Sequence, residues 1–194
     1  MKKFSLIVLF SLFFTGCMVQ NSYTNREQLM FISQTEEINM GTQAESEILK
    51  KEQLSKNIKE KNRVENVGKK LATVANEPNY DWKFYLIEGD TINAFCLPGG
   101  KVFVYEGILK IAKSDSELAT VISHEIAHAL LRHGAERMSI QQTTNMVGVL
   151  LKAGLQTQNN PIINQNFDLV YGLASNVGAV LPYSRKHEFE ADEL

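Results

Sequence analysis

The sequence is poor in cysteine and histidine and has no dominant charge, and each of these shortages narrows the protein classes that fit it. There are two cysteines, one of them in an N-terminal processing motif, so we expect no internal disulfide. The formal net charge of −2 provides no basic surface for nucleic acid. No long apolar run lies beyond the N-terminal segment, so no internal transmembrane helix is predicted.

The N-terminal segment has the pattern of a bacterial lipoprotein signal. Two lysines precede an apolar stretch, Phe4–Phe14, that is too short to span a bilayer, and the following letters FTGC resemble a lipobox. We therefore predict a signal peptide over 1–16, lipidation of Cys17 and a polar tether over 17–28. This predicts attachment to the bacterial cell envelope, on the outer membrane facing the periplasm in a Gram-negative organism. The alternative is a plain secretory peptide in which Cys17 is incidental.

Residues 29–194 are predicted to form one α+β domain that is mostly helical. Apolar spacing predicts two helices over 29–75, broken near Lys56–Asn62, and alternation then predicts a small antiparallel sheet with a hairpin at Pro98–Gly100. Within this sheet, Cys96 is interpreted as a small buried hydrophobe rather than a catalytic thiol. Two further apolar helices are expected between Ser139 and Pro182, which either pack in the core or form a surface that touches a membrane.

The next predicted helix carries the strongest chemical signal. Ser114 and Glu117 have the spacing of a capping box at a helix start, and the letters HEIAH follow at 124–128. Because His124 and His128 are four residues apart, both rings can reach a single ion, whereas Glu125 flanks that ion and can take a proton from a water molecule. This pattern predicts zinc, with Glu125 as the general base.

A catalytic zinc needs a third protein ligand, and the local pattern leaves its identity open. On this helix His133 points about 140° away from His128, so we expect it to cap helix carbonyls or meet the sheet. Near the C-terminus, Glu188 and Asp192 share one helix face, so one carboxylate can bind the metal while the other orients a ligand histidine. Lesser alternatives for the third ligand are Glu190 and His187, and a solvated acidic helix start would explain the same residues.

Taken together, HEIAH, EFEAD (188–192) and NAFCLPGG (93–100) resemble the HtpX-type and CAAX-prenyl-protease-type zinc metallopeptidases, in the lipoprotein branch related to Oma and BepA peptidases. The resemblance implies a gluzincin fold with one zinc per chain, in which Glu188 is the third ligand and Asp192 a residue behind the ligands. It also implies an edge strand in GGKVFVYEGIL that pairs with extended polypeptide. The substrate-binding residues expected from it are Asn93, Ala94, Gly100, Val102 and Val104.

The function implied is that of a zinc endopeptidase acting on misfolded or extended envelope proteins. Its oxyanion would be stabilised by a group after the EFEAD helix, and Arg185 or His187 are weak substitutes for it in this sequence. Because members of the family continue beyond Asp192, the domain is expected to be truncated and its last turn to fray. Alternatives are a chaperone-like, zinc-holding scaffold that binds extended segments, and a latent protease. Oligomeric state is not predicted.

Overall fold

The computed structural model describes residues 18–156, 171 and 181–194. They fall into two compact units, one holding residues 32–134 and 189–194, the other residues up to Phe31 together with 135–188. Outside the described residues lie the predicted signal peptide and Cys17. The same holds for the second helix predicted between Ser139 and Pro182, except for Tyr171 and the residues from 181 on. Among the helices described, none combines the length and the hydropathy needed to cross a membrane.

The unit built around residues 32–134 contains a three-stranded sheet of β3 (Lys83–Ile87), β4 (Ala94–Leu97) and β5 (Lys101–Tyr105). Its strand order is β3-β5-β4. The β4–β5 pair is antiparallel and is joined by the expected hairpin, whereas β3 runs parallel to β5. The prediction that the strand beginning at Lys101 is an edge strand is therefore wrong, because β3 pairs with β5 and leaves β4 on the outside.

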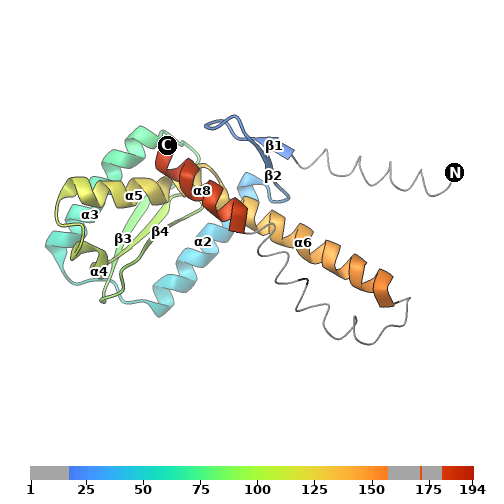
Figure 1. The fold of residues 1–194 in the computed structure, drawn as a ribbon. Coiled ribbons are helices and arrows are strands. Elements are labelled where there is room, and N and C mark those ends of the chain that lie inside the picture. Colours follow the sequence, from blue (N-terminus) through green and yellow to red (C-terminus); the bar gives the residue numbers. More distant parts are fainter. Residues whose placement is uncertain (1–17, 157–170, 172–180) are drawn as a thin grey trace. The chain divides into compact units, whose positions relative to one another are not determined.

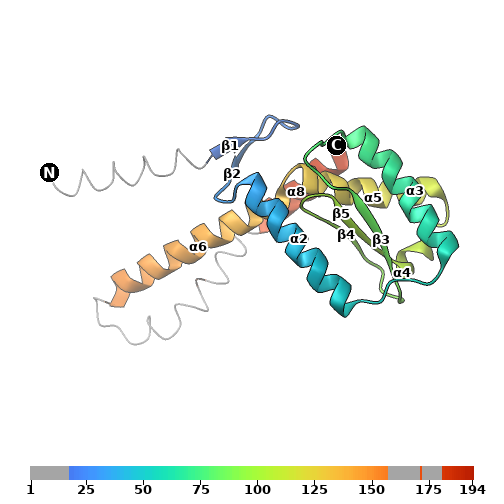
Figure 2. The same ribbon diagram turned by 180° about the vertical axis from the view of Figure 1, so that it is seen from behind.

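Helices cover both faces of this sheet (Figures 1 and 2). On one face α3 (Ile58–Ala75) and α5 (Asp115–Leu130) lie side by side, while the short α4 (Glu106–Leu109) follows β5 directly. On the other face Tyr85, Phe95 and Phe103 stack their rings, and the Tyr85 hydroxyl donates to Glu45 of α2 (Gln34–Lys51) at 2.5 Å. Alternation along each strand thus separates an aliphatic face from an aromatic one.

The aliphatic core lies between the sheet and the pair α3 and α5. Its fully buried members include Val64 of α3, Val102 and Val104 of β5, and Leu118 and Ile122 of α5. Burial of each such side chain stabilises the fold by roughly 1.5–3 kcal/mol relative to exposure. The sheet therefore holds α5, the helix of the HEIAH sequence, in a fixed place.

Side-chain caps define where the helices begin. Ser33 and Glu36 form a capping box before α2, and Ser114 forms the expected box with Glu117 before α5. Asn57 caps α3, so the break between α2 and α3 spans residues 52–57, earlier in the chain than predicted. The spacing of apolar residues identified both helices, but only the caps determine their ends.

The other unit combines an N-terminal hairpin with two helices. The strands β1 (Met18–Gln20) and β2 (Glu27–Leu29) pair antiparallel, and they lie largely within the segment 17–28 that is expected to be a polar tether. From residue 135 on, α6 (His133–Gln156) belongs to this unit, as does α8 (Leu181–Glu193) up to Glu188. At the centre of the unit, Glu136 accepts from both terminal nitrogens of Arg26 at 2.6 and 2.7 Å.

Candidate metal centre

Helix α5 brings His124 and His128 together, as the spacing predicts. Their Nε2 atoms are 3.1 Å apart and their rings meet edge to face, with centroids 4.7 Å apart. Both side chains are partly exposed, so they lie at the border between the core and the surface. Two nitrogen atoms held this close on a rigid helix can serve one ion.

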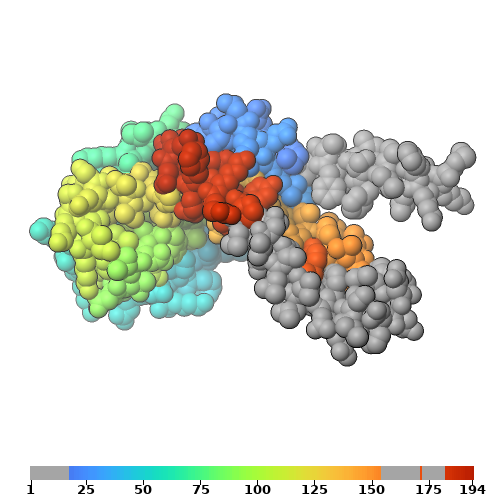
Figure 3. Space-filling model, in the orientation of Figure 1, coloured from blue at the N-terminus to red at the C-terminus, as the bar shows by residue number. Residues whose placement is uncertain are grey.

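Helix α8 provides a carboxylate close to both imidazoles. His124, His128 and Glu188 each offer one ligand atom, and these atoms all lie within 4.8 Å of one another. The end of α8 is fixed on α5 because Ala191 is buried with Ala127 and Leu131. Figure 3 shows this end of α8, in red, at the surface beside α5, in yellow. Two imidazoles and one carboxylate are the donor set of one class of catalytic zinc site, so these residues fit that ion.

The other C-terminal candidates have different partners. Asp192 lies 2.9 Å from Nδ1 of His124, the position from which a carboxylate can orient a ligand ring. Glu190 is buried and lies 3.1 Å from Nε2 of His133. His187 is buried, and its Nε2 lies 2.9 Å from Oε2 of Glu136, which does not fit its suggested roles as ligand or oxyanion group. The Arg185 side chain is exposed.

The prediction for His133, that it caps carbonyls or meets the sheet, is wrong. Helix α5 ends at Leu130, and Arg132 takes a left-handed conformation with φ of 56°. The Arg132 side chain is held by Glu37 at 2.7 Å and by the carbonyl oxygen of Ile32 at 2.9 Å. This turn brings Nδ1 of His133 to 2.8 Å from Nδ1 of His128. Positive φ at an arginine has no local sequence signal, so the geometry of a continuous helix misled the prediction.

Glu125 lies on the turn of α5 between the two histidines and is partly exposed. Its negative charge affects Cys96 on β4. Burial raises the pKa of the Cys96 thiol, and the Glu125 carboxylate raises that pKa further. The thiol of Cys96 contacts the carbonyl oxygen of Leu97 and remains protonated at neutral pH. Cys96 is partly buried and packs against the aliphatic core, in agreement with its interpretation as an apolar packing residue rather than a catalytic thiol.

Most of the residues expected to bind substrate are buried, and one is exposed. Val102 and Val104 are fully buried in the aliphatic core, and Ala94 is almost so, which excludes their side chains from lining a cleft. Gly100 is buried with a φ of 83°, and a Cβ there would lie 2.9 Å from Trp82, so it serves the hairpin turn. Only Asn93, just before β4, is exposed.

The outer strand β4 offers backbone groups, rather than side chains, for contact with a substrate chain. The Asn93 carbonyl oxygen accepts from the Tyr105 amide at 3.0 Å, which makes this residue pair a hydrogen-bonded one. Because such pairs alternate along an antiparallel ladder, the backbone amides and carbonyls of Ala94 and Cys96 point away from β5. Among the described residues no strand pairs with this side of β4, so an extended chain can pair there.

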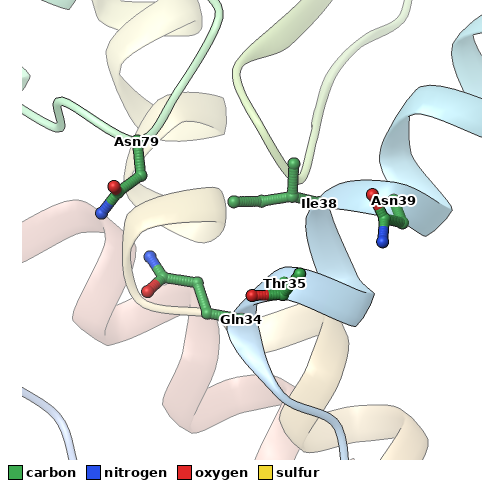
Figure 4. Close-up of a pocket in the computed structure, with 5 residues that line it drawn as sticks. All are labelled: Gln34, Thr35, Ile38, Asn39 and Asn79. Atoms are coloured by element: carbon green, nitrogen blue, oxygen red, sulfur yellow. The ribbon is translucent and has the colours of Figure 1, made fainter.

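A separate pocket of about 270 Å³ lies away from these residues. It is lined by four residues of α2 and by Asn79 from the segment between α3 and β3 (Figure 4). The lining is Gln34, Thr35, Ile38, Asn39 and Asn79. None of these side chains is ionisable, so the pocket has no group suited to acid–base or metal chemistry.

Comparison with known proteins identifies the family of this chain. A profile of peptidase family M48 matches residues 58–194. The chain belongs to peptidase family M48. The M48 match includes the HEIAH helix, the outer strand and α8, and it agrees with the α+β, zincin-type fold expected from the sequence.

Relatives of this M48 chain occur in mitochondria and in bacteria. It is 37% identical to the mitochondrial metalloendopeptidase OMA1 of Schizosaccharomyces pombe over 131 residues, which are 68% of this chain and 36% of the relative. It is 33% identical over 134 residues to the beta-barrel assembly-enhancing protease of Yersinia pestis, and 29% identical over 137 residues to that of Escherichia coli. Each of these two matches covers 68% of this chain and 27% of the relative, so the chain spans a minor part of each relative's length.

Proposed function

We propose that this M48 chain is a zinc-dependent endopeptidase that cleaves extended or misfolded proteins of the bacterial cell envelope. The observation that carries the proposal is the convergence of ligand atoms from His124, His128 and Glu188 within 4.8 Å. Zinc bound there would polarise the scissile carbonyl and lower the pKa of a water molecule. Asp192 lies beside Nδ1 of His124, where it would keep Nε2 of that ring directed at a bound zinc ion.

Proton transfer is assigned to Glu125. Its carboxylate flanks the histidine pair on α5, where it can accept a proton from the attacking water and then deliver it to the leaving amine nitrogen. The outer strand β4 positions the substrate by pairing its outward backbone groups with an extended segment. Because pairing through the backbone ignores side chains, this arrangement suits partly unfolded proteins of varied sequence.

Attachment by lipid at Cys17 and location in the envelope form part of the same proposal. They are supported by the lipobox-like FTGC and by relatives that are named beta-barrel assembly-enhancing proteases.

The decisive experiment compares wild type with Glu125→Gln. Zinc per chain is measured on the purified protein, and cleavage of casein is followed for both forms. We expect one zinc in each form and a loss of at least about 100-fold in cleavage rate for the variant, because the general base is removed while the ligands remain. Glu47→Gln, which removes an exposed carboxylate of α2, serves as the control and should cleave normally.

Two outcomes contradict the proposal. A wild-type protein that binds zinc stoichiometrically but does not cleave favours a zinc-holding scaffold for extended segments. A protein that binds no zinc, while folded, removes the metal centre itself.

A further inference from the structure

Behind the partly exposed His128 lies a buried histidine, and a buried carboxylate lies behind that. Nδ1 of His133 is 2.8 Å from Nδ1 of His128, and Nε2 of His133 is 3.1 Å from Oε2 of Glu190. Only 1% of the His133 side chain and 8% of the Glu190 side chain are exposed to solvent. The two imidazole rings cross at 70° with centroids 5.0 Å apart. Three side chains from the end of α5, the start of α6 and α8 thus form one row.

The row determines where the protons sit in neutral imidazoles. A carboxylate only accepts, so Glu190 places the proton of His133 on Nε2. The Nδ1 atom of His133 is then bare and accepts from Nδ1–H of His128. This leaves Nε2 of His128 without a proton, and that atom is the one that faces Nε2 of His124. A bare Nε2 is the form of imidazole that binds a divalent metal.

We propose that His133 and Glu190 are a positioning pair for the metal centre: they hold His128 in its Nδ1–H tautomer, with Nε2 aimed at the ion. The inference rests on the proposed function, which supplies the metal. His124 has a direct carboxylate partner in Asp192, whereas His128 reaches its carboxylate through the His133 ring. Both carboxylates are on α8, two residues apart, so one helix orients both imidazoles. His133 itself uses both ring nitrogens within the row and is not a ligand.

The first test reads the tautomers directly, without metal. This chain has four histidines, so ¹⁵N–¹H spectra of the labelled chain at about pH 8 can resolve each ring. We expect His128 to carry its proton on Nδ1 and His133 on Nε2. A proton on Nδ1 of His133 would overturn the inference. Because no zinc is needed, this readout decides the matter even if the proposed peptidase function fails.

The second test measures zinc affinity by competition with a fluorescent chelator. Glu190→Gln retains an acceptor oxygen but loses the charge, so we expect zinc binding about 10-fold weaker. His133→Phe keeps a ring but removes the bridge, and its affinity should fall further, up to about 100-fold. Addition of zinc should change the ¹⁵N chemical shift of His128 Nε2, as metal binding does. It should not produce such a change at either ring nitrogen of His133.

Glu136→Gln is the matched control. Glu136 is also buried and lies within hydrogen-bonding distance of a histidine Nε2, that of His187, yet it belongs to the other unit. This variant should lose stability but bind zinc within about twofold of wild type. If Glu190→Gln binds zinc as tightly as wild type, or if Glu136→Gln weakens binding as much, the role of the pair is merely structural and the inference is wrong.

Discussion

At the scale of single residues, neighbours decide what a reactive group can do. Cys96 lies on the outer strand of the sheet that packs against α5, the helix of the candidate metal centre, where a thiol invites interpretation as a nucleophile. Burial raises the pKa of its thiol, and the carboxylate of Glu125 raises it further, so the nucleophilic thiolate is disfavoured twice.

We therefore predict that Cys96 resists alkylation in the folded protein. In a Cys17→Ser chain, iodoacetamide at about pH 8 should modify the native form at least about 10-fold more slowly than the urea-unfolded form, because only the latter exposes an ordinary thiol. Mass spectrometry gives both rates. Glu125→Gln should remain slow, since burial is the larger cause. Equal rates for native and unfolded chains would show that Cys96 is accessible.

Residues of the site that follow a helical repeat were predictable from the sequence, and residues that follow a turn were not. The spacing of His124 and His128 fixes their mutual geometry wherever the helix lies, and the structure places them as expected. His133 was misplaced because the helix ends before it at Leu130. Glu188 and Asp192 required a family resemblance, since no local rule states which distant helix meets α5.

At the scale of elements, α2 approaches the β4–β5 hairpin very closely at a glycine. A Cβ at Gly41 would lie 2.0 Å from the carbonyl oxygen of Pro98. This oxygen belongs to the backbone of the hairpin turn, so it cannot give way as a flexible side chain would. Only a glycine lets α2 pack against the turn that ends β4.

Gly41→Ala should accordingly destabilise the protein, by about 3 kcal/mol in urea unfolding, because α2 must move off the hairpin. Gly134→Ala, in the first turn of α6, is the control: apart from its chain neighbours and the nearby backbone of its own helix, no described atom lies within 4 Å of the added Cβ. There the change should be neutral or stabilise by up to about 1 kcal/mol, since alanine favours a helix. A Gly41→Ala protein as stable as wild type would mean that α2 is loosely packed.

Strand order shows the limit of sequence reasoning for elements. The alternation of residues identified the strands and the Pro98–Gly100 hairpin, and capping residues marked the start of α5. The parallel pairing of β3 with β5 has no signature within either strand, because it depends on how the intervening segment crosses the sheet. The edge position was therefore assigned to β5 instead of β4. For the same reason Val102 and Val104 of β5 were expected to bind substrate, although their side chains lie in the core.

At the scale of the whole molecule, residues far apart in sequence are in contact within one unit. These contacts join the N-terminal hairpin to α6 and α8. Glu136 accepts from Arg26 and Gln28, and it lies 2.9 Å from Nε2 of His187. Burial alone would raise the pKa of Glu136, but hydrogen bonds and charge from Arg26 and His187 outweigh it and lower the pKa to about 2. The ionised carboxylate thus stabilises this unit.

The pH dependence of stability follows from that lowered pKa. The contribution of Glu136 is complete above its ordinary pKa of 4.5 and is lost as the pH falls through 4.5 towards 2. Glu136→Gln should lower the free energy of unfolding by about 3 kcal/mol at pH 7 and by little near pH 2. Urea unfolding at several pH values checks this, with Glu47→Gln as the exposed control. A difference from wild type that is independent of pH would contradict it.

Helix α8 has a consequence for the biosynthesis of the protein. Glu188, Glu190 and Asp192 all reside on it, whereas the histidines emerge from the ribosome much earlier. A nascent chain that has produced only α5 has two of the three proposed ligands and lacks the carboxylates of α8. Under the proposed function, hydrolytic competence would arise late, when this helix docks, and unfinished copies would be harmless to the proteins around them.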